Sequence, residues 1–286
     1  MIIFNDTVAL GDTLCTFPTV RSMLIQTDEP SSVYWTNSDA GALFPHARYN
    51  AVQRADPPSA AHDRVIRISL HDFVWSRPGW EHAPQEQFHS FALRRHGFTI
   101  DDDLRLELAF PIDSTVPTYD FVIAPCVLNN AWKNMGRDFW QALVTELRWR
   151  YGGSICAIGT SRLPSEADLL KIEPDIDRFR AIDYRRDNLT QYLVGVDYFW
   201  DEPLSRVAQL LSNVRGWFIS VDSGPSHLMR GIRRPHIEIY RHSVAVRYRT
   251  GMKDIEIPVP CPTVADIIAI FEQPAAAGER VSVRGG

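Results

Sequence analysis

The sequence has few cysteines, no long apolar run and no excess of positive charge. Its four cysteines lie far apart and form no Cys-x-x-Cys pair, which argues against a disulfide framework and against a zinc site. No apolar stretch approaches the length of about 20 residues that a membrane-spanning helix requires. The formal net charge of -5 provides no positive field over the whole molecule, so the composition argues against nucleic acid as a partner.

Two further absences narrow the class of protein. The N-terminus lacks the basic and long apolar segments of a secretory signal, and no internal repeat or low-complexity tract precedes the short tail after Pro274. The 286 residues are 45% hydrophobic and 23% charged, which is typical of a globular protein with one large or two medium domains. We therefore predict a cytoplasmic protein, either free or in peripheral contact with the inner face of the membrane.

A strand, turn, helix, strand pattern occupies the last third of the chain. Residues 218–221 predict a short strand, residues 222–224 a polar turn and residues 236–240 the next strand. Pro225 suits the first turn of the intervening helix, because its missing N–H costs nothing there. In open α/β sheets such a turn lies where ligands bind, and a helix N-terminus favours an anion such as phosphate. A helix cap without any ligand would explain the same residues.

A second pattern of this kind opens the chain. Residues 1–4 predict a strand, residues 6–10 a loop, and Gly11 and Asp12 the start of a helix. The helix is predicted from apolar residues at helical spacing, which are Leu14, Phe17, Val20, Met23 and Leu24. Asp12 is expected at or next to the N-cap, where an acidic side chain suits the helix dipole, so capping alone would account for it.

Both patterns resemble motifs of glycosyltransferase family 9, the bacterial heptosyltransferases. Residues 222–228, Asp-Ser-Gly-Pro-Ser-His-Leu, resemble the family's Asp-Ser/Thr-Gly-x-x-His-Leu motif, and residues 11–18 resemble its Gly-Asp-x-x-x-x-x-Pro motif. Two matches are looser. Lys133 follows Trp132 where the family carries Lys-x-Trp-Pro, and Glu166 opens a predicted helix after a glycine-ended strand. The resemblance extends in order from Met1 to about Glu272.

The resemblance implies the GT-B fold, an α/β architecture of two Rossmann-like domains with mainly parallel sheets facing a central cleft. We place the boundary in a polar, proline-bearing connection. An acceptor-side domain then spans residues 1–116, and a nucleotide-sugar-binding domain spans residues 117–286. In this fold the last predicted helix, residues 263–272, would pack back on the first domain.

The resemblance also implies an inverting, metal-independent glycosyltransferase without a cofactor. The donor would be a nucleotide-diphosphate sugar, with an ADP-sugar such as ADP-heptose favoured, and the acceptor a hydroxyl of a cell-surface glycan, glycolipid or protein. Asp12 would be the general base, and Gly11 and Thr13 would lie on the acceptor side. The implied donor-binding residues are Lys133, Glu166, Asp222, Ser223, Gly224, Pro225, Ser226 and His227.

Alternatives to these assignments stay open. The chain would alternatively be a nucleotide-sugar-binding protein without catalysis, or a transferase acting on a nucleic-acid or other unusual acceptor. Lys133 is equally well explained as a solvated loop lysine, Glu166 as an acid in the first turn of a helix, and His227 as a packing residue. We interpret the acidic run at residues 101–103 as a solvated helix cap and not as a metal site.

Overall fold

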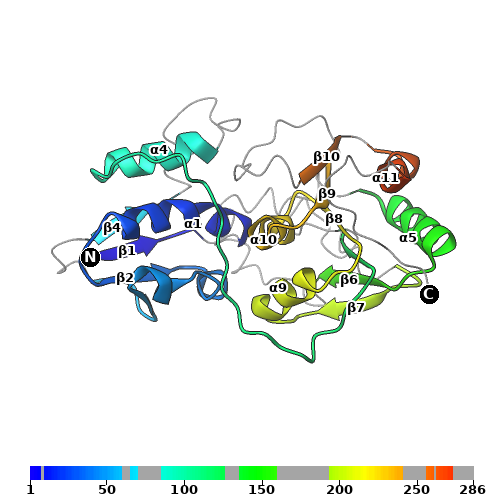
Figure 1. Cartoon of the computed structure of the whole chain (residues 1–286), viewed down its shortest axis with the longest axis horizontal. Helices are drawn as coiled ribbons and strands as arrows, with labels where there is room; N and C mark the ends of the chain where they lie inside the picture. Colours follow the sequence, from blue (N-terminus) through cyan, green and yellow to red (C-terminus); the bar gives the residue numbers. More distant parts are fainter. Residues whose placement is uncertain are drawn as a thin grey trace, which may run out of the picture. The chain divides into compact units, whose positions relative to one another are not determined.

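The computed structural model describes residues 1–7, 10–59, 65–69, 85–125, 135–159, 193–240, 256–260 and 262–272. The chain divides into two compact units, each with its own parallel sheet (Figure 1). The first unit contains Met1–Pro111 and Arg230–Arg233, and the second contains Ile112–Met229 and most of the chain that follows. The change of unit thus falls between Pro111 and Ile112, close to the predicted boundary at residue 116.

The first unit is built on a four-stranded sheet in the order β3-β2-β1-β4. Its strands are β1 (Ile2–Asn5), β2 (Ser31–Trp35), β3 (Ala51–Arg54) and β4 (Val65–Ile68), all parallel. Its helices are α1 (Leu10–Ile25), α2 (Ser38–Gly41), the short 3₁₀ helix η1 (His46–Tyr49) and α4 (Gln85–Arg95). Because β2 and β4 flank β1 on opposite sides, the winding of the sheet reverses between β1 and β4.

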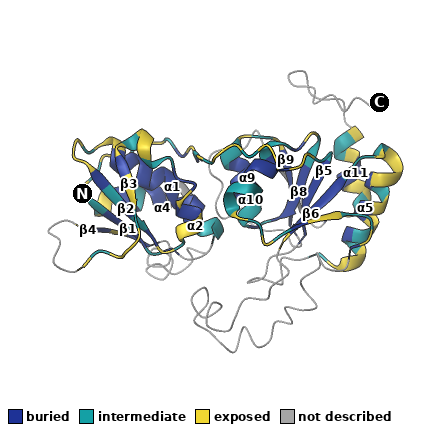
Figure 2. Ribbon diagram, turned by 90° about the horizontal axis from the view of Figure 1, so that it is seen from below, coloured by how far each residue is buried: buried dark blue, intermediate teal, exposed yellow. Residues whose placement is uncertain are grey.

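The core of the first unit forms around α1. The predicted apolar face of this helix is confirmed, since all five of its apolar residues are buried. Phe17 packs against Trp35 and Phe44 with ring centroids 5.0 and 5.1 Å apart, which joins α1 to the end of β2. Figure 2 shows most of α1 as buried. This packing holds the N-terminus of α1 beside the carboxyl end of β1.

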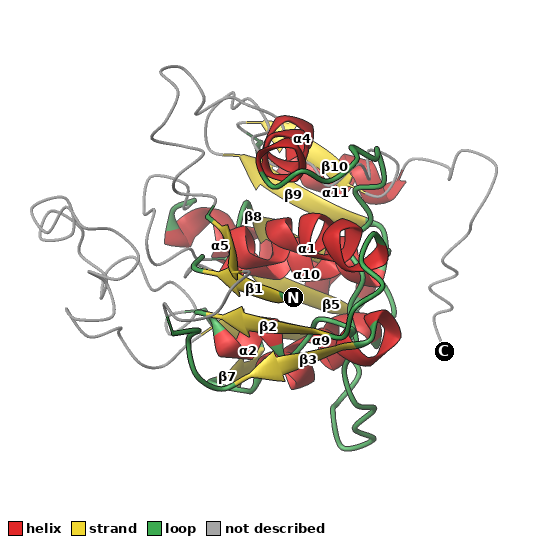
Figure 3. Ribbon diagram, turned by 90° about the vertical axis from the view of Figure 1, so that its left-hand side faces the viewer, coloured by secondary structure: helices red, strands yellow, loops and turns green. Residues whose placement is uncertain are grey.

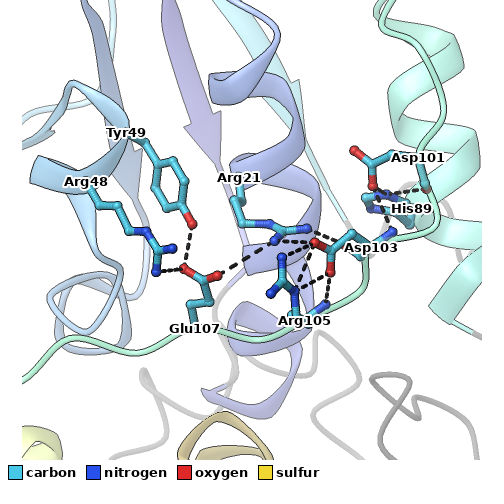
Figure 4. Close-up of polar contacts among 8 residues, drawn as sticks. All are labelled: Arg21, Arg48, Tyr49, His89, Asp101, Asp103, Arg105 and Glu107. Carbon is cyan, nitrogen blue, oxygen red and sulfur yellow. Dashed lines mark hydrogen bonds and ion pairs between the residues drawn. The ribbon is translucent and has the colours of Figure 1, made fainter.

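Charged side chains connect the segment after α4, residues 101–105, to α1 and α4 (Figure 4). Arg21 of α1 is only 3% exposed; its Nη1 lies 2.8 Å from Asp103 Oδ2, and its Nη2 donates to the Asp103 carbonyl at 2.6 Å. Arg105 donates to the same carboxylate at 2.6 Å, and His89 Nε2 lies 3.2 Å from Asp101 Oδ1. Our interpretation of this acidic run as a solvated cap is therefore wrong, because its carboxylates join the segment to two helices.

These contacts predict an acid-sensitive contribution to stability. The pKa of Asp103 is held well below its ordinary value, mainly by hydrogen bonds from Arg105 and further by those from Arg21. A lowered pKa stabilises the fold above the ordinary aspartate value of about 3.9, and this stabilisation is lost as the pH falls. Asp103→Asn should therefore lower the free energy of unfolding at pH 7 by about 1 kcal/mol, a figure that allows for solvent screening.

Thermal unfolding of both proteins between pH 7 and pH 3 measures this contribution. The difference in melting temperature should shrink as the pH falls below about 4, because this aspartate takes up a proton in the unfolded wild-type chain while it stays ionised in the folded one. A difference of the same size at both ends of this pH range would contradict an ion-pair role for Asp103.

The second unit is built on a six-stranded sheet in the order β10-β9-β8-β5-β6-β7. Its strands β9 and β10 lie side by side in Figure 3. Its strands are β5 (Phe121–Ala124), β6 (Ile155–Gly159), β7 (Asp197–Trp200), β8 (Trp217–Val221), β9 (His236–Tyr240) and β10 (Glu256–Pro260), all parallel. Numbered within the sheet, the order reads 6-5-4-1-2-3, which is that of dinucleotide-binding sheets. The winding reverses between β5 and β8.

Helices cover this second sheet and bury its central strands. They are α5 (Arg137–Tyr151), α9 (Leu204–Ser212), α10 (Gly224–Ile232) and α11 (Val264–Glu272). Every residue of β5 and β9 is buried, as expected for parallel strands covered on both faces. Helix α11 lies beside α5 (Figure 1), and its Ile267 and Ile268 join the core of the second unit. The buried face of the last helix therefore completes this core, and its packing on the first domain stays a prediction.

Candidate functional site

Both sequence motifs lie at a point where the winding of a sheet reverses. Asp222 directly follows β8, which pairs with β5 at the reversal in the second unit. Asp12 lies on the helix that follows β1, which pairs with β4 at the reversal in the first unit. Open α/β sheets bind ligands outside the carboxyl ends of their strands at such switch points. The topology of each sheet therefore puts a motif where this class of fold binds ligands.

The turn between β8 and α10 holds most of the predicted donor-binding residues. Asp222 and Ser223 link the strand to the helix, and Gly224, Pro225, Ser226 and His227 form the first turn of α10. Ser223 is 9% exposed, and within the described residues its buried hydroxyl has no hydrogen-bond partner. A buried polar group of this kind calls for a ligand, a water or an ion. At a helix N-terminus the fitting ligand is an anion.

The remaining residues of this predicted set are distributed as follows. Asp222 is half-buried at the end of the strand, and His227 is buried within the first turn of the helix. Lys133 and Glu166 lie outside the described residues, so their assignment stays a prediction. Among the described residues, no group of three or more His, Cys, Asp or Glu side chains is arranged to hold a metal ion.

The hydroxyl of Ser226 closes the β8–α10 turn. It accepts a hydrogen bond from the backbone N–H of Ser223 at 3.3 Å and lies 2.7 Å from the carbonyl oxygen of the same residue. It also lies 2.7 Å from Oε1 of Glu238, a fully buried carboxyl group on β9. The other oxygen of Glu238 accepts a hydrogen bond from the hydroxyl of Tyr240 at 2.7 Å.

Glu238 was missed in the sequence analysis. Residues 236–240 were taken only as a strand, although a charged residue between two isoleucines is a visible irregularity. Glutamate is almost never fully buried unless it is paired. A charged residue inside an apolar strand next to a ligand-binding motif was therefore the signal that would have identified it.

Asp12 lies in the first turn of α1, the helix that follows β1. Helix α1 begins at Leu10, so Asp12 is the third helical residue and not the N-cap. A carboxylate in the first turn still interacts favourably with the helix dipole. Gly11 and Asp12 are half-buried, whereas Thr13 is fully buried and donates its hydroxyl hydrogen to the carbonyl of Thr7 at 3.0 Å. In this structure Thr13 therefore holds the turn.

A buried polar network supports this turn from below. Asn5, at the end of β1, is 0% exposed. Its Nδ2 donates to Thr16 Oγ1 at 2.6 Å, and its Oδ1 accepts the N–H of Thr7 at 3.1 Å. The hydroxyl of Thr16 in turn donates to the carbonyl of Thr13 at 2.6 Å. The backbone on both sides of Asp12 is thereby fixed by side chains that have no access to solvent.

Comparison with known proteins decides the fold. No protein-family model matches the chain, and no curated protein matches its sequence. Among solved structures, the Escherichia coli heptosyltransferase WaaC with ADP aligns with a TM-score of 0.62 and 16% identity, over 95% of this chain and 98% of WaaC. The fold is that of the heptosyltransferases. The E. coli ADP-heptose LPS heptosyltransferase II agrees, with a TM-score of 0.61 and 11% identity over 95% of this chain and 96% of that enzyme.

A third heptosyltransferase-type structure differs in length. The iron-containing dodecameric glycosyltransferase TibC of enterotoxigenic E. coli aligns with a TM-score of 0.60 and 17% identity over 90% of this chain. This chain spans only 61% of TibC. The predicted α/β architecture with two parallel sheets is thus confirmed. In the described part of the chain, no helix combines the length and the apolar character needed to cross a membrane.

Proposed function

We propose that the chain is an inverting, metal-independent glycosyltransferase that uses a nucleotide-diphosphate sugar, with an ADP-sugar as the favoured donor. The observation that carries the proposal is the position of both motifs at the switch points of two parallel sheets in a heptosyltransferase fold. The relatives add support on the donor, because WaaC was solved with ADP and TibC in complex with ADP-D-beta-D-heptose. The acceptor is proposed to be a hydroxyl of a cell-surface glycan, glycolipid or protein.

On the donor side, the N-terminus of α10 and the buried hydroxyl of Ser223 would hold the diphosphate. The carboxylate of Asp222 would accept a hydrogen bond from a hydroxyl of the donor. Lys133 would supply positive charge to the phosphates, and Glu166 would bind the ribose. Oriented donors at a helix N-terminus stabilise charge that grows on a leaving group, so this mechanism requires no metal ion.

On the acceptor side, Asp12 would take the proton of the attacking hydroxyl. The acceptor oxygen forms its bond to the anomeric carbon of the sugar while the bond from that carbon to the diphosphate oxygen breaks. The electron pair leaves with the nucleoside diphosphate, and attack from the opposite face inverts the anomeric centre. A positioned general base of this kind contributes about 10²–10⁴-fold to the rate.

A thermal-shift panel of ADP, UDP, GDP, CDP and TDP sugars tests the proposal. A ligand that binds only the folded state raises the melting temperature, so the panel identifies the base of the donor. A rise with an ADP-sugar is expected. The absence of any rise across the panel would remove the proposed function.

Asp222→Ala tests the placement of the donor site. Loss of a hydrogen bond to a charged group should weaken binding of the donor found in the panel roughly tenfold to hundredfold, with the melting temperature of the ligand-free protein nearly unchanged. Titration calorimetry measures the affinity. Asp197→Ala is the matched control, because this exposed aspartate begins the edge strand β7 of the same sheet. Equal affinity in the wild type and Asp222→Ala would move the donor site away from this turn.

A further inference from the structure

We infer that Glu238 is a positioning residue of the donor site, acting through the hydroxyl of Ser226. Its buried carboxyl group holds that hydroxyl, which in turn fixes the backbone of Ser223 at the N-terminus of α10. The inference rests on the proposed function and assigns to that function a residue of β9 that lies outside both sequence motifs.

The geometry links the strand to the turn through a single atom. Ser226 Oγ contacts both backbone groups of Ser223 and one carboxyl oxygen of Glu238. The hydroxyl accepts the N–H of Ser223, and its single hydrogen is shared between two acceptors at 2.7 Å, the carbonyl of Ser223 and Oε1 of Glu238. Ser226 is itself fully buried, so water does not replace any of the three.

This link fixes the peptide of Ser223 and leaves its side chain for the ligand. Both the N–H and the carbonyl of Ser223 are bound by Ser226, whereas within the described residues the hydroxyl of Ser223 has no partner. The direction of that hydroxyl therefore depends on the backbone that Ser226 holds. Among the described side chains, only Glu238 is hydrogen-bonded to the hydroxyl of Ser226.

Packing alone does not account for a carboxyl group at this position. The neighbours of Glu238 along β9 are Ile237 and Ile239, and an aliphatic side chain would fill a buried site in a parallel strand without a desolvation cost. A buried carboxyl group is weak evidence for a gain in stability, because the cost of desolvation offsets the attraction of its partners. Two of its contacts run to Ser226 of the turn and to Tyr240 on its own strand.

The test is a double-mutant cycle between Ser226→Ala and Glu238→Ala. The probe is the nucleoside diphosphate among ADP, UDP, GDP, CDP and TDP that binds the wild type, with affinity measured by titration calorimetry. Each single variant should weaken binding about tenfold, and the double variant should weaken it no further, because both changes break the same link. Ser212→Ala is the matched control, since it removes a serine hydroxyl bonded to a backbone carbonyl within another helix of the same unit.

Two further measurements separate positioning from general stability. Glu238→Gln keeps an oxygen that accepts from Ser226, so it should restore affinity to within about twofold of the wild type. Amide hydrogen exchange without nucleotide should be faster at residues 223–226 in Ser226→Ala and Glu238→Ala than in the wild type. Hydrogen exchange does not depend on donor binding. If Glu238→Ala fails to fold, Ser226→Ala alone still tests the inference.

The outcomes that contradict the inference differ in whether they also contradict the proposed function. Wild-type affinity and wild-type exchange in Ser226→Ala would overturn the inference and leave the proposed function standing. Additive losses in the double variant would also overturn it, because Ser226 would then act on the donor independently of Glu238. A wild-type protein that binds no nucleoside diphosphate would remove the proposed function, and the inference with it.

Discussion

Asp12→Asn is expected to lower turnover by roughly 10²–10⁴-fold while the fold and the donor affinity stay nearly unchanged. The substitution keeps the shape of the side chain and removes the proton acceptor. Asp12 is the third residue of α1, where the interaction of a carboxylate with the helix dipole contributes about 0.3–1 kcal/mol of stability. The catalytic and structural roles therefore differ in which quantity changes.

The measurement compares the rate of sugar transfer with the melting temperature, once the thermal-shift panel has identified a donor. Asp28→Asn is the control, an exposed aspartate that precedes β2 in the same unit. Wild-type turnover in Asp12→Asn would remove the general-base assignment. Donor binding without any measurable transfer by the wild type would instead favour the alternative of a nucleotide-sugar-binding protein.

The local elements around both motifs were predictable from the sequence. The strand, turn and helix at residues 218–232 and the apolar face of α1 follow from periodicity and turn chemistry, which act over a few neighbouring residues. The order of the strands was not predictable in this way. Pairing of β5 with β8 joins Phe121 to Trp217, and no local pattern encodes a partner so far along the chain. The fold was therefore predicted from the resemblance of two motifs.

The roles of charged and polar residues were the least predictable part. The run at residues 101–103 has the composition of a solvated cap, and its actual partner Arg21 lies 82 positions from Asp103. Thr13 is assigned to the acceptor side by its place in a motif, which stays a prediction, and the bond from its hydroxyl to the carbonyl of Thr7 was not predictable from the sequence. The sequence shows which side chains carry a charge or a hydroxyl group, whereas the groups that they contact are determined by the tertiary structure.

The two β–α turns share one form of support. Under α10, the hydroxyl of Ser226 connects the turn to Glu238, and under α1, the side chain of Asn5 connects the turn to Thr16. In both cases a buried polar side chain on a strand bonds to a threonine or serine within the first two turns of a neighbouring helix, although α1 follows the strand of Asn5 and α10 precedes the strand of Glu238. Fully satisfied buried polar networks specify one arrangement of the backbone, because any other arrangement leaves a polar group unpaired. The backbone of Ser223 and of Thr13, next to Asp222 and Asp12, is thus held by buried side chains.

Asn5→Asp is expected to lower the free energy of unfolding by about 4 kcal/mol at pH 7 and by much less at pH 4. Asn5 is 0% exposed, and its Nδ2 donates to Thr16 Oγ1. An introduced carboxylate cannot donate there, and burial raises the pKa of such a group by up to about 3–5 units, each unit being worth about 1.36 kcal/mol. The unfolded-state pKa of about 3.9 lies about three units below pH 7, so at pH 7 the loss of stability corresponds to about three pKa units.

The sign of the pH dependence distinguishes a carboxyl group in this buried network from one that is exposed to solvent. The pKa of the introduced carboxyl group is higher in the folded than in the unfolded chain, so above about pH 4 the unfolded chain releases its proton first and stability falls as the pH rises. Below that pH the group is protonated in both states, and its O–H replaces the lost donor to Thr16. Asn50→Asp, at an exposed position of the same unit, should show no such dependence. Denaturant unfolding of both variants between pH 4 and pH 7 decides the matter, since a loss of equal size at both pH values would mean that water reaches the base of the Asp12 turn.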